Sequence, residues 1–500
     1  MPDLLRLGDL LAGEDATYHG CDPDTRVTGL AVDSRRVGPG AAFVAAPGLA
    51  RDGHEFVAAA LAAGAAVAVV QRGRLPAPPG PRVELAAVAE ALPRLCARAF
   101  GEPGQRLRLA GVTGTNGKTT VTFLVTAMLA AAGRPHARLG TTGNWLVDRG
   151  EPAGFTTPFP LELQELLARA VARGATDLVM EVSSHALAQA RVEPLRYDAV
   201  GLTSFSQDHL DFHGTMAAYL AAKCLLPARH LRPGGVVVAA VDDQPAAAEF
   251  LASAPAGARV WRASRGGDPR AELAASSVLS DPTGTSAQVE TPAGRLALRS
   301  PLVGAFNLDN LLVAIGLGLG LGLGLETIGA ALEACRGAPG RLERVAVPGI
   351  AGPTVLVDYA HTPDAVARAL QAVRPACRGR LFVVLGCGGD RDPTKRAPMG
   401  EQAATLADRF YATSDNPRTE DPQAIVEQML AGVPAGRRDR VVAIVDRRAA
   451  IGQAIADASA EDWVLVAGKG HEDYQIVGTT KVHFDDREEA AAALARRGRG

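Results

Sequence analysis

Short apolar runs alternate with longer amphipathic stretches along nearly the whole chain. Short apolar runs bounded by turn residues are typical of buried strands, and apolar residues that recur every three or four positions are typical of helices. This pattern predicts strands at residues 42–46, 65–70, 177–182, 200–204, 235–240, 354–358, 381–386, 409–414, 441–446 and 463–467. Strands that alternate with helices in this way predict an α/β fold built on parallel sheets.

Two turn-rich segments, residues 101–105 and Gly337-Ala-Pro-Gly340, divide the pattern into three predicted domains. A chain of 500 residues exceeds what a single hydrophobic core usually supports. We therefore expect a small N-terminal α/β domain over residues 1–103, a central domain with a P-loop-type parallel sheet over 104–337, and a Rossmann-like C-terminal domain over 338–500.

Three segments depart from the simple alternation. Residues 71–81 predict a loop, after which a helix is expected up to Phe100. Residues 277–299 predict one or two β-hairpins, because Pro-Thr-Gly and Pro-Ala-Gly turns interrupt them. Residues 307–335 predict helices. Within them, the Gly-Leu alternation at 316–325 also fits a strand, but we favour a helix whose glycines permit close packing.

A glycine-rich turn with the residues Gly114-Thr-Asn-Gly-Lys-Thr-Thr120 joins a predicted strand to a predicted helix. Backbone N–H groups freed by such glycines can surround a phosphate at a helix N-terminus, while Lys118 adds a positive charge and the Thr119 hydroxyl can bind Mg²⁺. The turn departs from the usual spacing, because Val112 stands where a P-loop has its first glycine. Its place between strand and helix nevertheless predicts nucleotide binding.

Further polar residues follow predicted strands of the central domain. Glu181 stands where a P-loop protein places an acidic Mg²⁺ ligand, although its cluster could also cap the next helix. His209 lies in Gln-Asp-His-Leu-Asp-Phe-His and could bind a second divalent ion. A lysine on an apolar helix such as Lys223 usually extends its ammonium group to solvent.

The C-terminal domain carries its polar residues after strands as well, where parallel sheets place ligands. Asp358 could accept hydrogen bonds from a ribose, or could belong to an ordinary strand-to-helix connection. Arg391 and Arg418 offer planar guanidinium groups suited to carboxylates, and Glu472 offers an anion. Two cations and an anion at one sheet edge would suit a zwitterionic amino acid, whereas any single arginine is more often a solvated surface residue.

Composition excludes several classes of protein. The net charge is −2 and no dense basic stripe is present, so we expect no nucleic-acid partner. The six cysteines are scattered without a Cys-x-x-Cys pair, which predicts a reduced, cytoplasmic chain without a zinc site. We expect neither a secretory signal nor a membrane span, because the only long uncharged run, residues 311–325, is one-third glycine.

Taken together, six motifs resemble the Mur ligases in their order and rough spacing across nearly the whole chain. They are Gly-Thr-Asn-Gly-Lys-Thr-Thr, Glu-Val-Ser-Ser-His, Asp-His-Leu-Asp-Phe-His-Gly, Asp-Tyr-Ala-His-Thr-Pro, Asp-Asn-Pro-Arg and Gly-Lys-Gly-His-Glu. The resemblance implies a ligase that uses ATP and Mg²⁺ to add meso-2,6-diaminopimelate to UDP-N-acetylmuramoyl-L-alanyl-D-glutamate through an acyl phosphate. The same ligation with L-lysine or another diamino acid, or a ligase similar to folylpolyglutamate synthetase, remains an alternative.

The resemblance also implies roles for individual residues, which we group by ligand. Catalysis would involve Lys118, Glu181, His209 and Lys223, the last as a carbamate, and the metal ions would be held by Thr119, Glu181, His209 and this carbamate. ATP would contact Gly114, Thr115, Asn116, Gly117, Lys118, Thr119, Thr120, Asn307, Arg341 and Asp358. The nucleotide-sugar peptide would contact Val32, Ser34, Leu49, Ala50, Arg51, Thr156, Thr157, Ser183, Gln189 and Arg191. Diaminopimelate would contact Arg391, Asp415, Asn416, Pro417, Arg418, Gly468 and Glu472.

One position departs from the family pattern. The family usually has asparagine before the threonine pair, and Phe155 stands there in this chain. A contact from the side chain at this position is therefore not carried over. We expect a monomeric enzyme. The contrasting hypothesis is a nucleotide-gated binding module without catalytic activity, whereas a kinase would have no use for an amino-acid pocket in a third domain.

Overall fold

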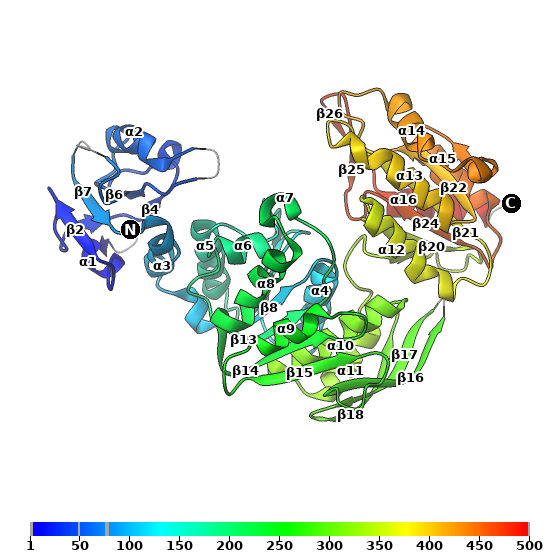
Figure 1. Cartoon of the computed structure of the whole chain (residues 1–500), viewed down its shortest axis with the longest axis horizontal. Helices are drawn as coiled ribbons and strands as arrows, with labels where there is room; N and C mark the ends of the chain where they lie inside the picture. Colours follow the sequence, from blue (N-terminus) through cyan, green and yellow to red (C-terminus); the bar gives the residue numbers. More distant parts are fainter. Residues whose placement is uncertain (1–3, 49–50, 76–79, 282, 499–500) are drawn as a thin grey trace. The chain divides into compact units, whose positions relative to one another are not determined.

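The computed structural model describes residues 4–48, 51–75, 80–281 and 283–498 (Figure 1). It divides into two compact units, each made of separate segments of the chain. The first unit contains Met1–Lys118, Leu129–Arg262 and Gly316–Leu323, and the second contains Thr119–Met128, Ala263–Ile315 and Gly324–Gly500. Among the described residues, no helix is both long enough and apolar enough to cross a bilayer.

A five-stranded sheet forms the N-terminal part of the first unit, with the order β2-β7-β6-β5-β4. Its strands are β2 (Ala16–His19), β4 (Leu30–Ala31), β5 (Ala42–Val44), β6 (Val67–Gln71) and β7 (Arg82–Leu85). All neighbours pair in parallel except β2 and β7. Helix α2 (Val57–Ala62) packs with one face of the sheet, whereas α1 (Leu7–Leu10) and α3 (Val88–Ala99) pack with the other.

The predicted helix after residue 81 is therefore wrong in its first part, because β7 occupies Arg82–Leu85. In β7, the charged residues Arg82 and Glu84 are less buried than Val83 and Leu85, which is the alternation expected of a half-buried strand. Four residues are too few for this period to stand out against the helical pattern that follows.

A second sheet of the first unit carries the phosphate loop. Its parallel strands lie in the order β9-β12-β8-β13-β14, and β10 and β11 extend the β9 edge in antiparallel fashion. The strands are β8 (Arg108–Thr113), β9 (His136–Leu139), β10 (Asn144–Leu146), β11 (Arg149–Glu151), β12 (Asp177–Glu181), β13 (Tyr197–Leu202) and β14 (Leu231–Ala240). The helices that follow these strands include α4 (Lys118–Ala131), α5 (Pro160–Ala172), α6 (Ser184–Ala188), α7 (Leu210–His213), α8 (Met216–His230) and α9 (Ala246–Ala252).

The glycine-leucine run forms a helix as favoured, but a shorter one than expected. Helix α10 (Ala305–Gly320) ends before Gly322, whose φ of 77° lies in the left-handed region, and α11 (Leu325–Ala334) begins after it. A Cβ atom on Gly316 would lie 2.9 Å from Val238, and one on Gly320 would lie 2.7 Å from Ala199. The glycines therefore allow the helix to approach β13 and β14 closely, which offsets their low helix propensity.

An antiparallel meander follows along the chain. Strand β15 (Arg259–Ser264) pairs in parallel with β16 (Leu273–Asp281) at its last two residues, and β16, β17 (Gly284–Thr291) and β18 (Gly294–Ser300) pair in sequence. The hairpins expected at residues 277–299 are thus confirmed.

A six-stranded sheet with the order β19-β20-β24-β21-β22-β23 belongs to the second unit. Its strands are β19 (Glu343–Val345), β20 (Thr354–Asp358), β21 (Leu381–Cys387), β22 (Arg409–Ser414), β23 (Val441–Ala443) and β24 (Trp463–Ala467), and only β19 is antiparallel to its neighbour. Helices α12 (Pro363–Val373), α13 (Arg396–Leu406) and α14 (Pro422–Ala431) cover one face, and α15 (Arg447–Asp457) and α16 (Asp486–Arg497) cover the other (Figure 1). This doubly wound parallel sheet confirms the Rossmann-like prediction. The hairpin of β25 (Tyr474–Val477) and β26 (Thr480–His483) was not predicted.

A buried ion pair joins the two helices on one face of this sheet. Arg447 and Asp486 are both fully buried and form two hydrogen bonds, of 2.6 and 2.8 Å. Arg447 also donates to the backbone oxygens of Ser414 and Ala467, the last residues of β22 and β24. The pair therefore fixes the positions at which two loops leave the sheet.

We predict that Arg447→Met lowers the free energy of unfolding by about 3–5 kcal/mol, because the buried Asp486 carboxylate loses its counter-charge. The neighbouring pair of Arg448 and Glu489 has similar bond lengths, of 2.7 and 2.8 Å, but its arginine side chain is 61% exposed. Arg448→Met is the matched control and should cost no more than about 1 kcal/mol. Urea denaturation of the full chain measures both, and equal losses would contradict the assignment.

Candidate functional site

The phosphate loop connects β8 to α4 and encloses its own lysine. The Lys118 ammonium group donates to the carbonyl oxygens of Gly114 and Thr115, at 2.8 and 2.9 Å. Gly114 has a φ of 144°, and a Cβ there would lie 2.0 Å from the Thr203 hydroxyl, so only glycine fits. A hydrogen bond of 3.0 Å from the Asn116 amide to Ser204 fixes the loop to the residues after β13. The predicted loop, strand and helix are all present.

Glu181 is the last residue of β12 and is buried. Both oxygens of its carboxylate accept 3.0 Å hydrogen bonds from Thr141, one from the amide and one from the hydroxyl. A Cβ on Gly140 would lie 2.4 Å from this carboxylate, so the neighbouring backbone also confines it. Ser183, and not Glu181, caps the next helix, because the Ser183 hydroxyl accepts a hydrogen bond from the Ala186 amide. The Glu181 carboxylate therefore has a fixed position at the carboxyl edge of the sheet.

Three histidines gather beside this carboxyl edge. The ring of His185 lies 4.7 Å from that of His209 and 5.4 Å from that of His213, measured between centroids. Burial lowers the pKa of each of the three, and the neighbouring imidazoles contribute for His185 and His213. His209 has a φ of 52°, which places it at a sharp turn before α7. Sequence reasoning selected His209 and missed the other two as members of the cluster.

Lys223 does not extend to solvent. Its side chain is 1% exposed, and its ammonium group lies 4.3 Å from the ring centroid of Tyr219, one helical turn earlier on α8. Burial lowers the pKa of Lys223 well below its usual range, and the positive charge of Lys118 lowers it further. The expectation of a solvent-exposed lysine is therefore wrong, because burial separates the whole side chain from water.

The residues expected to hold the nucleotide-sugar peptide fall into two groups within the first unit. In the N-terminal part, Val32 is 41% exposed, Ser34 opens a short 3₁₀ helix, and the Arg51 guanidinium lies 4.4 Å from the Phe56 ring centroid. Leu49 and Ala50 lie outside the described residues. In the second group, Thr156 hydrogen-bonds Thr141 at 3.0 Å, so it lies next to the Glu181 carboxylate.

Thr157, Ser183, Gln189 and Arg191 are joined by hydrogen bonds. The Thr157 hydroxyl donates to the backbone oxygen of Glu181 at 2.9 Å and accepts from the Ser183 amide at 3.0 Å. Arg191 donates to the Gln189 side chain at 2.8 Å and to the Thr157 carbonyl at 3.2 Å. The structure therefore brings this group together around the carboxyl end of β12.

The residues expected to bind the adenosine part of ATP lie in the second unit. Both oxygens of Asp358 accept 2.8 Å hydrogen bonds, from the amides of Leu342 and Ala360, and burial raises the pKa of this carboxyl group. The guanidinium of Arg341 lies 4.8 Å from the Tyr359 ring centroid. Asn307 is buried and donates to the Val303 carbonyl at 2.9 Å. Asp358 thus orders the segment after Gly340 as well as offering an acceptor.

Three loops meet at the carboxyl edge of the C-terminal sheet, following β21, β22 and β24. A Cβ on Gly389 would lie 1.9 Å from the Pro417 carbonyl oxygen, so the first two loops touch through their backbones. Arg418 donates to the Gly389 carbonyl at 2.7 Å and has a φ of 52°, a conformation held by backbone hydrogen bonds to Ile476 and Gly478 of the β25–β26 hairpin. Arg391 is exposed. Among the described residues, neither arginine forms an ion pair with a carboxylate.

Lys469 is a member of this loop cluster that sequence reasoning missed. It is fully buried and donates to Glu472 at 3.2 Å and to the Asn416 side chain at 3.4 Å, while its ammonium lies 3.9 Å from Asp415. Asn416 also donates to Glu472 at 2.9 Å. In the sequence, only its position inside the Gly-Lys-Gly-His-Glu motif indicates that Lys469 belongs to the site. Lysine is rarely buried without partners, so its burial is not expected from the sequence.

The donor set of the first unit fits a magnesium ion. The described residues contain no cluster of three or more His, Cys, Asp or Glu side chains arranged to hold a metal. Magnesium needs no such cluster, because it usually binds one or two carboxylates together with substrate phosphates and water. The Glu181 carboxylate keeps free lone pairs beyond its two hydrogen bonds, whereas Lys223 can bind a cation only after conversion to a carbamate.

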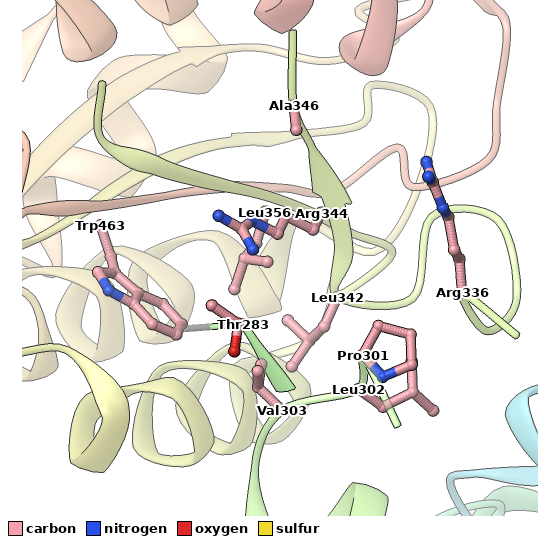
Figure 2. A pocket seen from close by; sticks show the side chains of 10 residues that line it. All are labelled: Thr283, Pro301, Leu302, Val303, Arg336, Leu342, Arg344, Ala346, Leu356 and Trp463. Carbon is pink, nitrogen blue, oxygen red and sulfur yellow. The ribbon is translucent and has the colours of Figure 1, made fainter. Parts of the chain in front are cut away.

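A cavity of about 200 Å³ lies at the opposite edge of the C-terminal sheet (Figure 2). Trp463, the first residue of β24, lines it together with Leu342 and Leu356, and among the described residues its charged lining consists of Arg336 and Arg344. The motif loops leave the other ends of these strands, so this cavity is separate from the amino-acid loops.

Three family models match the chain in order. They are described as the Mur ligase family catalytic domain, at residues 26–99, the Mur ligase middle domain, at 112–318, and the Mur ligase glutamate ligase domain, at 340–470. A UDP-N-acetylmuramoyl-L-alanyl-D-glutamate–2,6-diaminopimelate ligase from Gloeobacter violaceus is 47% identical over 496 residues, which is 99% of each chain. The enzyme of the same name from Synechococcus elongatus is 48% identical over 95% of each chain.

Solved structures give the same result. A UDP-N-acetylmuramoyl-L-alanyl-D-glutamate–2,6-diaminopimelate ligase superposes with a TM-score of 0.73 at 31% identity and 99% coverage of each chain. A folylpolyglutamate synthase from Mycobacterium tuberculosis, complexed with ADP and AMPPCP, superposes with a TM-score of 0.59 at 22% identity over 80% of this chain and 93% of that one, which shows a shared fold. The motifs, the three matching models and the full-length relatives all agree, and this chain belongs to the Mur ligase family.

Proposed function

We propose that this protein is an ATP-dependent amide ligase that joins meso-2,6-diaminopimelate to UDP-N-acetylmuramoyl-L-alanyl-D-glutamate. The observation that carries this proposal is a loop cluster at the carboxyl edge of the C-terminal sheet, where Arg418 has no carboxylate partner among the described residues. The full-length relatives named for this reaction support it. The folylpolyglutamate synthase likeness concerns the fold alone and does not favour the alternative acceptor.

The reaction needs a leaving group, because a carboxylate and an amine do not condense unaided in water. ATP transfers its γ-phosphoryl group to the side-chain carboxylate of the D-glutamyl residue, which yields ADP and an acyl phosphate. The amine of the incoming amino acid attacks the acyl carbon, and the tetrahedral intermediate expels inorganic phosphate as the amide forms. Lys118 and the amides of residues 114–117 would neutralise the transferring phosphoryl group.

Magnesium bound by Thr119, Glu181, His209 and a carbamate on Lys223 would supply further positive charge beside the phosphates. A neutral lysine amine adds to carbon dioxide, forming an N–C bond and releasing one proton, which gives a carbamate anion. The lowered pKa of Lys223 favours the neutral amine that this addition requires. The buried amine would then become an anion that can bind a cation.

Diaminopimelate differs from L-lysine by one carboxylate at its distal end. We assign recognition of that carboxylate to Arg418, with Arg391, Asp415, Asn416, Pro417, Gly468 and Glu472 completing the pocket. A partly buried guanidinium such as that of Arg418 costs free energy when it lacks its anionic partner, so the pocket would reject lysine. We further assign residues 1–103 to nucleotide-sugar binding, 104–337 to ATP binding and 338–500 to amino-acid binding, in a monomeric cytoplasmic enzyme.

ADP release with the UDP-muramoyl dipeptide and a panel of amino acids tests the function directly. We expect release to require both the dipeptide and meso-diaminopimelate, with the product mass increased by one diaminopimelyl residue. Lys118→Ala should lower kcat by at least about a hundredfold, because the phosphoryl charge is no longer neutralised. ADP release without either co-substrate would point to a nucleotide-gated binding module or an uncoupled ATPase instead.

Arg418→Ala should remove most of the preference for diaminopimelate over L-lysine. We expect the wild-type ratio of kcat/KM values to exceed about a hundredfold and the variant ratio to fall by at least tenfold, mainly through loss of activity on diaminopimelate. Arg438→Ala, which removes an exposed arginine elsewhere in the same unit, is the control. An unchanged ratio in Arg418→Ala would place specificity elsewhere.

Lys223→Met should abolish most activity, and a short carboxylate such as acetate or propionate should restore part of it by replacing the carbamate. In the wild type, kcat should fall as the pH drops through the lowered pKa of Lys223, because the ammonium form cannot add carbon dioxide. Added bicarbonate should raise kcat after removal of carbon dioxide. A bicarbonate effect that persists in Lys223→Met would contradict this role.

A further inference from the structure

Arg191 is a buried cation without an anionic partner among the described residues. The residue is 8% exposed, and burial lowers the pKa of its guanidinium. Within the described part of the chain, its hydrogen bonds go to neutral oxygens, those of the Gln189 side chain and the Thr157 backbone. Buried charges in proteins are normally paired, so an arginine in this state is suited to an anion that arrives with a ligand.

Two phenylalanine rings cover this guanidinium. The ring centroid of Phe159 lies 3.8 Å from the central carbon of the Arg191 guanidinium, and that of Phe155 lies 5.8 Å from it. The two rings meet edge to face, with centroids 5.0 Å apart. Phe155 is 52% exposed and Phe159 is 38% exposed, which are high values for phenylalanine side chains in a folded chain. We call Phe155, Phe159 and Arg191 the aromatic–arginine cluster.

The cluster lies beside Glu181. Arg191 donates to the carbonyl of Thr157, whose hydroxyl donates in turn to the backbone oxygen of Glu181. These short links place the free donors of Arg191 near the carboxyl end of β12. An acceptor whose reacting carboxylate lies at Glu181 would bring its other carboxylate close to Arg191.

We propose that Phe155 is a positioning residue for the acceptor and acts through Arg191; this inference rests on the proposed function. Its ring excludes water from the guanidinium and stabilises it by a cation–π contact, so that Arg191 binds the free α-carboxylate of the terminal D-glutamyl residue in a poorly hydrated setting. Phe155 thus strengthens an ion pair without making a hydrogen bond of its own. This role explains how the position can dispense with the asparagine of the family pattern.

Phe155→Leu tests the proposal, because leucine keeps an apolar side chain but removes the ring. We expect KM for the UDP-muramoyl dipeptide to rise about threefold to thirtyfold. The kcat value and the KM values for ATP and diaminopimelate should stay close to wild type. Phe155→Tyr, which keeps the ring, should restore the wild-type KM.

Ionic strength gives a second measurement that a merely structural role would not affect. Water that reaches the guanidinium in Phe155→Leu lets salt screen the ion pair. The KM for the dipeptide should therefore rise more steeply with sodium chloride in Phe155→Leu than in the wild type. Trp145→Leu removes another partly exposed aromatic ring, one that lies over Gly150, and should change neither quantity.

The outcomes separate this inference from the proposed function. Wild-type turnover together with an unchanged dipeptide KM in Phe155→Leu overturns the inference and leaves the function standing. A uniform change in every kinetic constant, or a fall in melting temperature that Phe155→Tyr does not reverse, also overturns it. Wild-type protein that neither binds nor consumes the dipeptide overturns both.

Discussion

The fully buried ion pair between Arg447 and Asp486 is the constraint on which the amino-acid loops depend. Arg447 binds the backbone oxygens of Ser414 and Ala467, and the proposed ligand-binding loops begin at the next residue in each case. The last peptide groups of β22 and β24 therefore have fixed positions before any loop residue is considered. Asp486 neutralises the charge of Arg447, so Arg447 can hold both strand ends from inside the protein. The loops can therefore consist of glycine and polar residues and still start from fixed positions.

Close backbone contact extends this order into the loops. Gly389 approaches the carbonyl of Pro417 so closely that a Cβ would overlap it. Hydrogen bonds to the β25–β26 hairpin hold the backbone of Arg418 in the left-handed region. Lys469 donates hydrogen bonds to both Asn416 and Glu472 and so connects them. The guanidinium of Arg418 is thereby presented by a rigid backbone, which is what recognition of a planar carboxylate requires.

Buried cations recur at the proposed sites, and their partners differ. Lys469 lies among Asp415, Asn416 and Glu472, so its charge is compensated. Lys223 is fully buried near the positive Lys118, so its charge is disfavoured and the amine becomes nucleophilic. Arg191 cannot lose its proton at neutral pH and is covered by two rings instead. Burial therefore has a different consequence at each cation, set by its neighbours. It leads to a structural anchor at Lys469, and in our proposals to a carbamate at Lys223 and to anion binding at Arg191.

The sequence by itself determined the α/β class, the phosphate loop and most parallel strands of the two larger sheets, but it missed β9, β10, β11 and β19. These features are local, since an apolar run and the turn after it lie within a few residues of each other. It could not determine the strand β7 or the hairpin β25–β26, because four-residue patterns are too short to be distinguished from their surroundings.

Tertiary structure alone decided which polar side chains lose contact with water. The sequence pattern predicts a solvated lysine at Lys223 and gives no indication that Lys469 is buried. Burial depends on elements distant in the chain, and it sets the free energy of each charge. The chemistry of these residues therefore follows from the packing around them, which no local pattern encodes.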